Sequence, residues 1–186
     1  MTTTLVIIVV IVLVVLFLVA KYNGLVKLRN NRENAFADID VQLKQRHDLV
    51  PQLVETVKGY AAHEKETFEK VIAARNGAVS AKSIDEKIVA ENSLSAALSG
   101  MRVTLEAYPE LKANQNFMQL QEEIADLENK LSAVRRYFNS ATKEYNNAVE
   151  TFPSNIIAGM FNFHKEIMFD LGEERKSYEE APKIQF

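Results

Sequence analysis

The sequence predicts an all-α protein, with an N-terminal transmembrane helix followed by an antiparallel bundle of about four long helices. Three observations predict this fold class. Leu5 to Ala20 is an unbroken apolar run. Glycine and proline are scarce, with six and four among 186 residues, which suits long helices better than a turn-rich β fold. Finally, apolar residues alternate spacings of three and four over about five heptads from Phe117 to Phe152, the pattern of a helix packed along a continuous seam.

The apolar run is long enough to anchor the chain in a bilayer. Its sixteen residues span roughly 24 Å as a helix, against a hydrocarbon core of ~30 Å. Three threonines, residues 2–4, can extend the helix at one end. Lys21 and Tyr22 at the other end suit the membrane interface, where an ammonium group and an amphipathic ring are stable. We therefore assign residues 1–23 to an anchor.

A cleaved signal peptide is the alternative, but it needs a basic start and small residues at its cleavage site. No Lys or Arg precedes the run, and bulky Leu18 stands near its end, so a retained anchor is favoured. Basic residues flank only its C-terminal side: Lys21, Lys27, Arg29 and Arg32. The positive-inside rule then predicts a single-pass protein of the cell membrane, with the N-terminus outside and the bulk of the chain in the cytoplasm.

Residues 24–171 are predicted to form the bundle. The first helix is expected to run from the membrane to about Asn76, with a kink rather than a break at Pro51 and with Gly77 marking its end. A second helix covers about Ile84 to Tyr108, preceded by a capping box formed by Ser83 and Glu86.

A third helix is expected from about Pro109 to Thr151, and a fourth from Ser154, as N-cap, to about Leu171. The fourth segment is strongly apolar, which is typical of core; a helix lying on the membrane surface is the other interpretation. Residues 172–186 are predicted to be an extended tail.

No catalytic or metal-binding template matches. The net charge of −3 gives no field that favours nucleic acid, and the absence of cysteine excludes thiolate chemistry. His63–Glu64 begins like a zinc-binding H-E-x-x-H motif, but Thr67 stands where the second histidine belongs. We expect no cofactor, no small-molecule substrate and no enzymatic activity.

The densest polar cluster lies around Pro51 on the first helix, where Asp40 and Asp48 are each one helical turn from Lys44. A solvated charged face is the ordinary interpretation, and a contact surface for a partner or a second copy is the functional one. With two aromatic residues of the fourth segment, the candidate interaction surface comprises Asp38, Asp40, Lys44, Arg46, Asp48, Pro51, Glu55, Lys58, Phe161 and Phe163.

The chain resembles the LemA family over nearly all its length after the anchor. The residues that carry the resemblance are the segments 22–26, 28–30, 38–44, 48–51, 53–60, 108–113 and 152–155, together with His63–Glu64, Arg135–Arg136 and Ala181–Pro182. The resemblance implies an N-terminal anchor, an N-out topology and an antiparallel helical bundle. It implies no reaction, and it points weakly to membrane proteases and envelope-stress proteins as companions.

These observations favour a non-enzymatic, membrane-anchored scaffold that associates with other copies of itself. The alternative is an adaptor or regulator of another membrane protein, such as a membrane protease. In that case the tail ending Ile184–Gln185–Phe186 can dock as an extended peptide.

Overall fold

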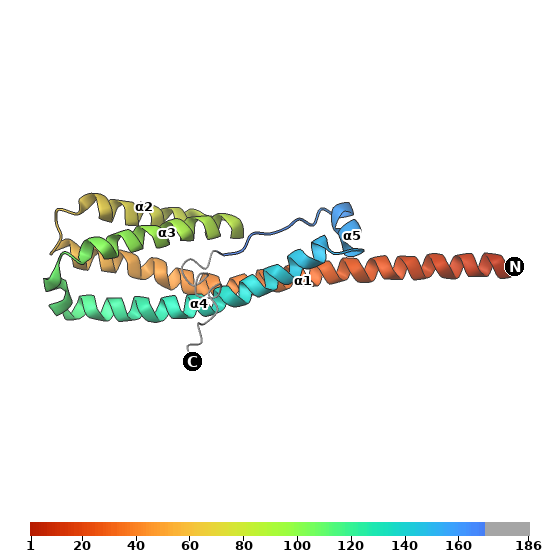
Figure 1. Ribbon diagram of the computed structural model, residues 1–186, viewed down its shortest axis with the longest axis horizontal. Coiled ribbons are helices and arrows are strands. Elements are labelled where there is room, and N and C mark those ends of the chain that lie inside the picture. Colours follow the sequence, from red (N-terminus) through yellow and green to blue (C-terminus); the bar gives the residue numbers. More distant parts are fainter. Residues whose placement is uncertain (170–186) are drawn as a thin grey trace, which may run out of the picture. The chain divides into compact units, whose positions relative to one another are not determined.

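A computed structural model describes residues 1–169, and within them every regular element is a helix. The order is α1 (Thr2–Lys58), α2 (Lys65–Ser80), α3 (Ile84–Leu105), a 3₁₀ helix η1 (Pro109–Ala113), α4 (Gln115–Glu150) and α5 (Ser154–Met160) (Figure 1). The all-α prediction is confirmed. The predicted tail and its docking motif lie outside the described residues.

The chain divides into two compact units, and α1 and α4 contribute residues to both. The first unit is Met1–Ala37 with Tyr137–Met168. Among the described residues, the second is Asp38–Arg136 with Phe169.

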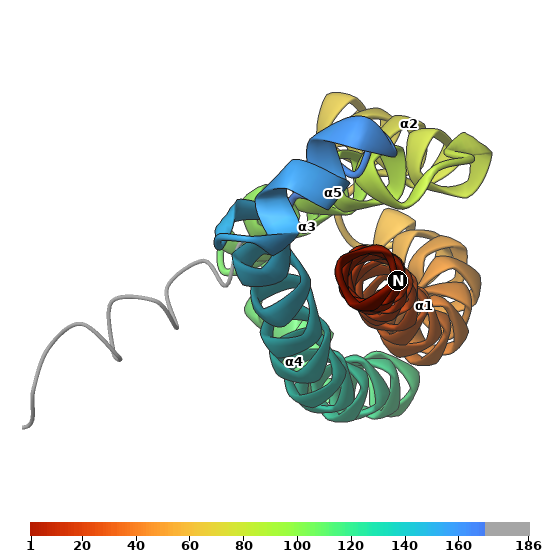
Figure 2. The ribbon, with the colours of Figure 1, turned by 90° about the vertical axis from the view of Figure 1, so that its right-hand side faces the viewer.

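The second unit is a bundle of four helical segments, in which successive helices reverse direction (Figure 1). α2 and α3 run side by side in both ribbon views (Figure 2). The core of this unit includes Val54 and Val57 from α1, Phe68 and Val71 from α2, Leu94 and Met101 from α3, and Phe117 from α4. The short connections place neighbouring helices antiparallel, as predicted.

The first unit contains the apolar N-terminal stretch of α1, which extends beyond the other helices of that unit (Figure 1). Its apolar side chains from Leu5 to Val19 are 39–66 % exposed. Beyond them, Leu25 on α1 packs with Tyr145 on α4 and with Ile157, Ala158 and Phe163. The N-terminal end of α1 is therefore not covered by the rest of the described chain, whereas α1 is part of a packed core farther along.

Three helix boundaries differ from the prediction. α1 ends at Lys58, and residues 59–64 form the turn into α2, so the first predicted helix is really two. Gly77 lies inside α2 and does not end a helix. The third helix begins at Gln115 because Pro109 opens the separate η1. By contrast, α1 continues across Pro51, and the Ser83–Glu86 capping box is present.

The fourth predicted helix is the largest correction. α5 has seven residues, ends at Met160, and has Pro153 rather than Ser154 as its N-cap. The Ser154 hydroxyl instead donates to the carbonyls of Ala148 and Thr151. Asn162 then takes a left-handed conformation (φ 59°), which short polar side chains tolerate, and residues 163–169 follow without regular secondary structure.

Candidate functional site

The charged residues predicted as a contact surface on α1 separate into exposed and buried groups. Asp38, Lys44, Asp48, Glu55 and Lys58 are exposed. Asp40 pairs with Lys87 of α3 at 2.6 Å, whereas the sequence suggested Lys44 as its partner. Lys58 pairs with Glu55 within α1 at 2.9 Å. An ion pair this exposed contributes little to stability, so both side chains can exchange it for another contact.

Arg46 belongs to the interior rather than to a surface. Its guanidinium reaches Glu91 of α3 at 3.1 Å and Glu128 of α4 at 2.7 Å. The side chains of Arg46 and Glu91 are 4 % and 1 % exposed. The Nε2 atom of His47 lies 2.5 Å from the other oxygen of Glu91. Since a buried carboxylate must be paired, Glu91 joins α3 to two consecutive residues of α1, and Arg46 is not available to an external partner.

Pro51 has a structural consequence that the sequence did not reveal. Proline lacks the N–H that would bond to the carbonyl four residues earlier, which here belongs to His47. The Nε of Arg75 on α2 donates to that carbonyl at 3.0 Å. The proline therefore frees a backbone acceptor in α1 that α2 uses as an attachment point.

Acidic residues of α1 and α4 lie close together on the surface of the second unit. Asp48 and Leu49 line a shallow groove with Glu123, Asp126 and Leu127. Asp126 is already paired with Lys130 at 2.6 Å. The described residues contain no group of three or more acidic or histidine side chains placed to hold a metal ion.

Of the two residues that begin like a zinc-binding motif, Glu64 makes a contact within the fold. Glu64, at the N-cap of α2, accepts a hydrogen bond from the Tyr108 hydroxyl at 3.0 Å, and His63 is exposed. That bond to a carboxylate raises the pKa of Tyr108, chiefly because it stabilises the protonated phenol.

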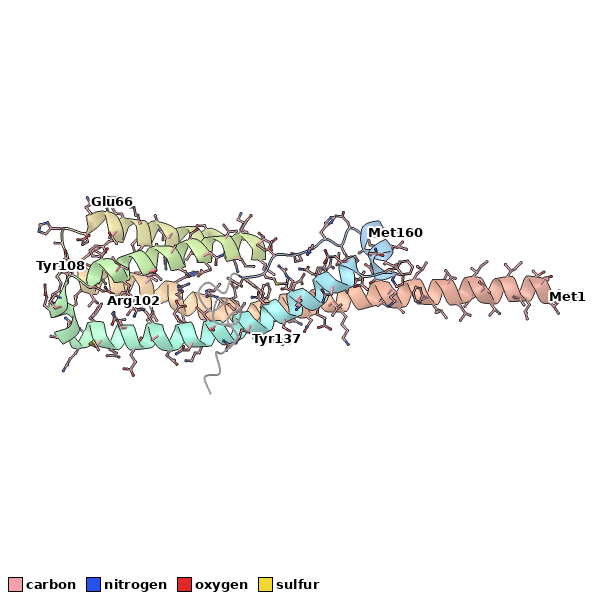
Figure 3. All side chains as sticks on the ribbon, in the orientation of Figure 1. Met1, Glu66, Arg102, Tyr108, Tyr137 and Met160 are labelled. Atoms are coloured by element: carbon pink, nitrogen blue, oxygen red, sulfur yellow. The ribbon has the colours of Figure 1, made fainter. Side chains whose placement is uncertain are left out.

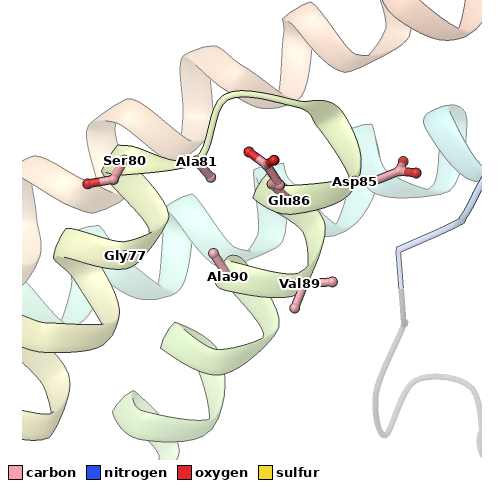
Figure 4. Close-up of a pocket in the computed structure, with 7 residues that line it drawn as sticks. All are labelled: Gly77, Ser80, Ala81, Asp85, Glu86, Val89 and Ala90. Carbon is pink, nitrogen blue, oxygen red and sulfur yellow. The ribbon is translucent and has the colours of Figure 1, made fainter.

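A shallow depression at the α2–α3 turn is lined by Gly77, Ser80, Ala81, Asp85, Glu86, Val89 and Ala90. Asp85 points away from the alanines, and Glu86 lies under the turn (Figure 4). The Glu86 carboxylate accepts from the backbone N–H groups of Lys82 and Ser83. These two bonds hold the pKa of Glu86 below its ordinary value. The carboxylate is thus occupied as a helix cap.

The two aromatic candidates, Phe161 and Phe163, meet the end of the apolar run. The Tyr22 ring centroid lies 4.8 Å from that of Phe161 and 5.8 Å from that of Phe163. The Arg29 guanidinium lies 5.2 Å from the Phe163 ring, within cation–π range. Phe163 is buried, whereas Phe161 remains 55 % exposed.

The segment that carries these rings is fixed by polar contacts. Asn146 of α4 donates to the carbonyl of Glu166 at 2.8 Å and accepts from its N–H at 2.9 Å. Arg32 of α1, nearly buried, pairs with the Glu166 carboxylate at 3.2 Å. Nearby, burial raises the pKa of Tyr145, with the negative charge of Glu166 adding to the effect.

Comparison with known proteins gives the family. The family model described as "LemA family" matches residues 35–186. The chain belongs to the LemA family. A relative named Protein LemA, from Metamycoplasma hominis, is 26 % identical over 159 residues, covering 83 % of this chain and 71 % of the relative.

A second relative of this LemA family member is named Magnetosome protein MamQ, from Magnetospirillum gryphiswaldense. It is 21 % identical over 175 residues, covering 80 % of this chain and 64 % of that protein. The chain thus spans slightly less than two thirds of this relative's length. The family match begins after the apolar run, so the anchor is argued from its own residues.

Two contacts in this LemA family protein involve candidate functional residues that the sequence did not predict. Asn146 and Glu166 are twenty residues apart, and no periodic pattern relates them. Tyr22 was assigned to the membrane interface, but its contact with Phe161 depends on the chain reversal after α5. The one sequence feature that indicates this region is its composition, because the segment that follows Pro153 is apolar and contains no charged residue.

Proposed function

We propose that this LemA family protein is a non-enzymatic scaffold, anchored in the cell membrane by α1 and self-associating there. One observation carries the proposal. The apolar stretch, 0 % buried within the structure, belongs to the same unbroken helix that supplies core residues to both units. An apolar helix of this kind needs a lipid environment, and whatever holds it also holds the bundle.

The charge distribution supports an N-out orientation. Lys21, Lys27 and Arg29 follow the apolar run, and no Lys or Arg precedes it. Arg32 is bonded to Glu166 in the folded chain, but orientation is set during insertion, when its charge still counts. The bulk of the chain is then cytoplasmic.

Self-association is supported by one face of α3. Between Ile88 and Met101 the single charged residue is Glu91, which is buried. The exposed side carries Val89, Ala96, Gly100 and Val103, at spacings of seven, four and three, and the polar residues exposed between them, Asn92, Ser93 and Ser99, are small and uncharged. The two valines are 62 % and 66 % exposed. A helix face without charges is unusual for solvent contact, and small residues allow a second helix to approach closely.

The experiment is a measurement of the native mass of the full-length protein in mild detergent by light scattering, with single-cysteine cross-linking. Because the chain has no cysteine, Val103→Cys reports on the α3 face without background. Val41→Cys on α1 is the matched control, since Val41 is similarly exposed (57 %). We expect a defined oligomer and a disulfide-linked dimer with Val103→Cys only.

A monomeric full-length protein would contradict the scaffold. That result would favour the alternative, an adaptor or regulator of another membrane protein. An oligomer in which both cysteines cross-link equally would keep self-association and remove α3 as its surface.

A further inference from the structure

We propose that the α5 surface, defined as Phe152, Ile156, Met160 and Phe161, lies in the interface of the lipid bilayer that holds α1. This second attachment rests on the membrane anchoring proposed above and adds to it. Its occupant is lipid, rather than another protein, and four observations within the first unit lead to it.

The first observation is exposure. Phe152, Ile156, Met160 and Phe161 are 75 %, 54 %, 69 % and 55 % exposed. Four large apolar side chains gathered within ten residues exceed the isolated exposed residues that soluble proteins normally carry.

The second observation is that α5 is apolar on both sides. Ile157 and Ala158 are each 2 % exposed and pack against Leu25 and Tyr145. The exposed residues of α5 are Asn155, Ile156, Gly159 and Met160, and no residue of α5 is charged. Asn155 is the one polar side chain among these exposed residues, so the outer face of α5 is far less polar than the face that a helix normally presents to water.

The third observation is position along α1. Phe161 lies against Tyr22, and Tyr22 is two residues beyond Ala20, the last residue of the apolar run. That run spans roughly 24 Å, so a ~30 Å hydrocarbon core reaches past one or both of its ends. The α5 surface therefore lies where acyl chains meet headgroups, beside the helix that enters them. Figure 3 labels Met160 at about the level along α1 from which the N-terminal stretch extends alone.

The fourth observation is the distribution of aromatic and basic groups. Phe17 lies 5.6 Å from the Lys21 ammonium, and Arg29 stacks on Phe163. From Tyr22 to Arg29 is seven residues, or about 10 Å along the helix. Aromatic rings therefore lie at the end of the apolar run, and basic side chains follow one to two helical turns farther from the bilayer centre. This arrangement stabilises a protein at a membrane interface.

Segment 161–168 is held in this position by α4 and α1. The two hydrogen bonds between Asn146 and the Glu166 backbone, with the Arg32–Glu166 ion pair, keep the chain that follows α5 against the first unit. The α5 surface is thus presented by a fixed segment. A second lipid contact beside the anchor restricts how far the first unit can tilt about the point where α1 leaves the bilayer.

The test uses tryptophan fluorescence, because the chain contains no tryptophan. Full-length Phe161→Trp is reconstituted in phosphatidylcholine vesicles, with and without bromine atoms on the acyl chains, which quench tryptophan on contact. Phe17→Trp is the positive control inside the apolar run. Tyr137→Trp is the negative control: Tyr137 is 54 % exposed in the same unit, and its neighbour Phe138 packs beside Phe36, about 21 Å along α1 from Tyr22.

We expect Phe161→Trp to show blue-shifted emission and to lose fluorescence in brominated vesicles nearly as Phe17→Trp does, while Tyr137→Trp is unaffected. Met160→Trp gives a second probe of the same surface, and circular dichroism checks that each variant keeps its helical content.

The outcomes separate the two proposals. If Phe17→Trp is quenched and both α5 probes behave like Tyr137→Trp, the proposed lipid contact of the α5 surface is wrong. The proposal that α1 anchors the protein in the membrane is then retained. Blue-shifted but unquenched α5 probes would show that protein, such as a second copy, covers the surface, which also overturns the lipid contact. If Phe17→Trp itself is not quenched, the anchoring proposal fails and this inference fails with it.

Discussion

Arg46 and Pro51, both predicted as surface residues, take part in joining helices to one another. Their sequence context is a run of charges on a helix, which usually faces water. Burial of Arg46 depends on Glu91 and Glu128, which are 45 and 82 positions away and belong to other helices. Local periodicity carries no information on partners at that separation.

The buried ion pair makes a prediction about stability. Glu91→Leu removes the carboxylate that His47 contacts and one of the two that pair with Arg46, so the nearly buried guanidinium keeps only the partly exposed Glu128. Unfolding of the full-length protein in mild detergent should then require about 3 kcal/mol less free energy. The double variant Arg46→Met with Glu91→Leu should recover most of that loss, because two apolar side chains replace the pair.

An exposed pair on the same helix is the control. Glu55→Gln breaks the Lys58–Glu55 contact and should change the unfolding free energy by less than about 1 kcal/mol. A loss from Glu91→Leu as small as the loss from Glu55→Gln would mean that the Arg46 site is not sealed from water.

Pro51 and Arg75 should be energetically coupled. Arg75→Ala removes a charged donor from the His47 carbonyl and should lower the unfolding free energy by about 2 kcal/mol. In a Pro51→Ala background the backbone regains its own donor to that carbonyl, so the same change should have a smaller effect. Chemical denaturation of the four proteins measures the coupling, and additive losses would argue against it.

At the scale of helices, local signals located some boundaries and missed others. The capping box before α3 was correct because its bonds join residues three apart, so the sequence contains the whole motif. The break after Lys58 was missed because apolar periodicity continues through Ala61 and Phe68, which are both buried. The sequence predicts a helix end at Gly77, yet α2 continues through it, since glycine within a helix costs only about 1 kcal/mol relative to alanine.

The capping box makes a prediction about pH. Ser83→Ala should lower the unfolding free energy by about 1 kcal/mol. The Glu86 side of the box depends on ionisation. Its pKa is lowered in the folded chain, so its contribution is complete above the ordinary value of 4.5 and is lost as the pH falls through the folded-state pKa.

The destabilisation caused by Glu86→Ala should therefore shrink as the pH is lowered below that value. Thermal unfolding of wild type and variant at a series of pH values measures it. A difference independent of pH would show that the charged carboxylate is not what caps the helix.

The clamp on the chain after α5 makes a second prediction at this scale. Asn146→Ala removes both hydrogen bonds to Glu166, and amide exchange in residues 163–168 should accelerate while exchange in α3 stays unchanged. Asn147→Ala is the matched control, because the Asn147 side chain is exposed on the same helix. Equal acceleration by both variants would mean that the clamp does not order this segment.

For the whole molecule, the proposed orientation is directly measurable. In intact cells a membrane-impermeant maleimide should label Thr3→Cys and should not label Val103→Cys until the cells are lysed. The native chain offers no background thiol. Labelling of Val103→Cys in intact cells would reverse the orientation and place the bundle outside.

The sequence alone determined the all-α class, the exposed apolar stretch and the packed seam of α4, because each depends on spacings within a single helix. Most of that seam is buried, as at Leu127, Leu131, Phe138 and Tyr145, but Phe152, predicted as its last member, is 75 % exposed. Tertiary structure decided which charges are buried, where α1 ends and how α5 presents an apolar face beside Tyr22. Those features depend on contacts between residues far apart in the chain, and helical periodicity specifies which face of a helix is apolar without specifying what that face meets.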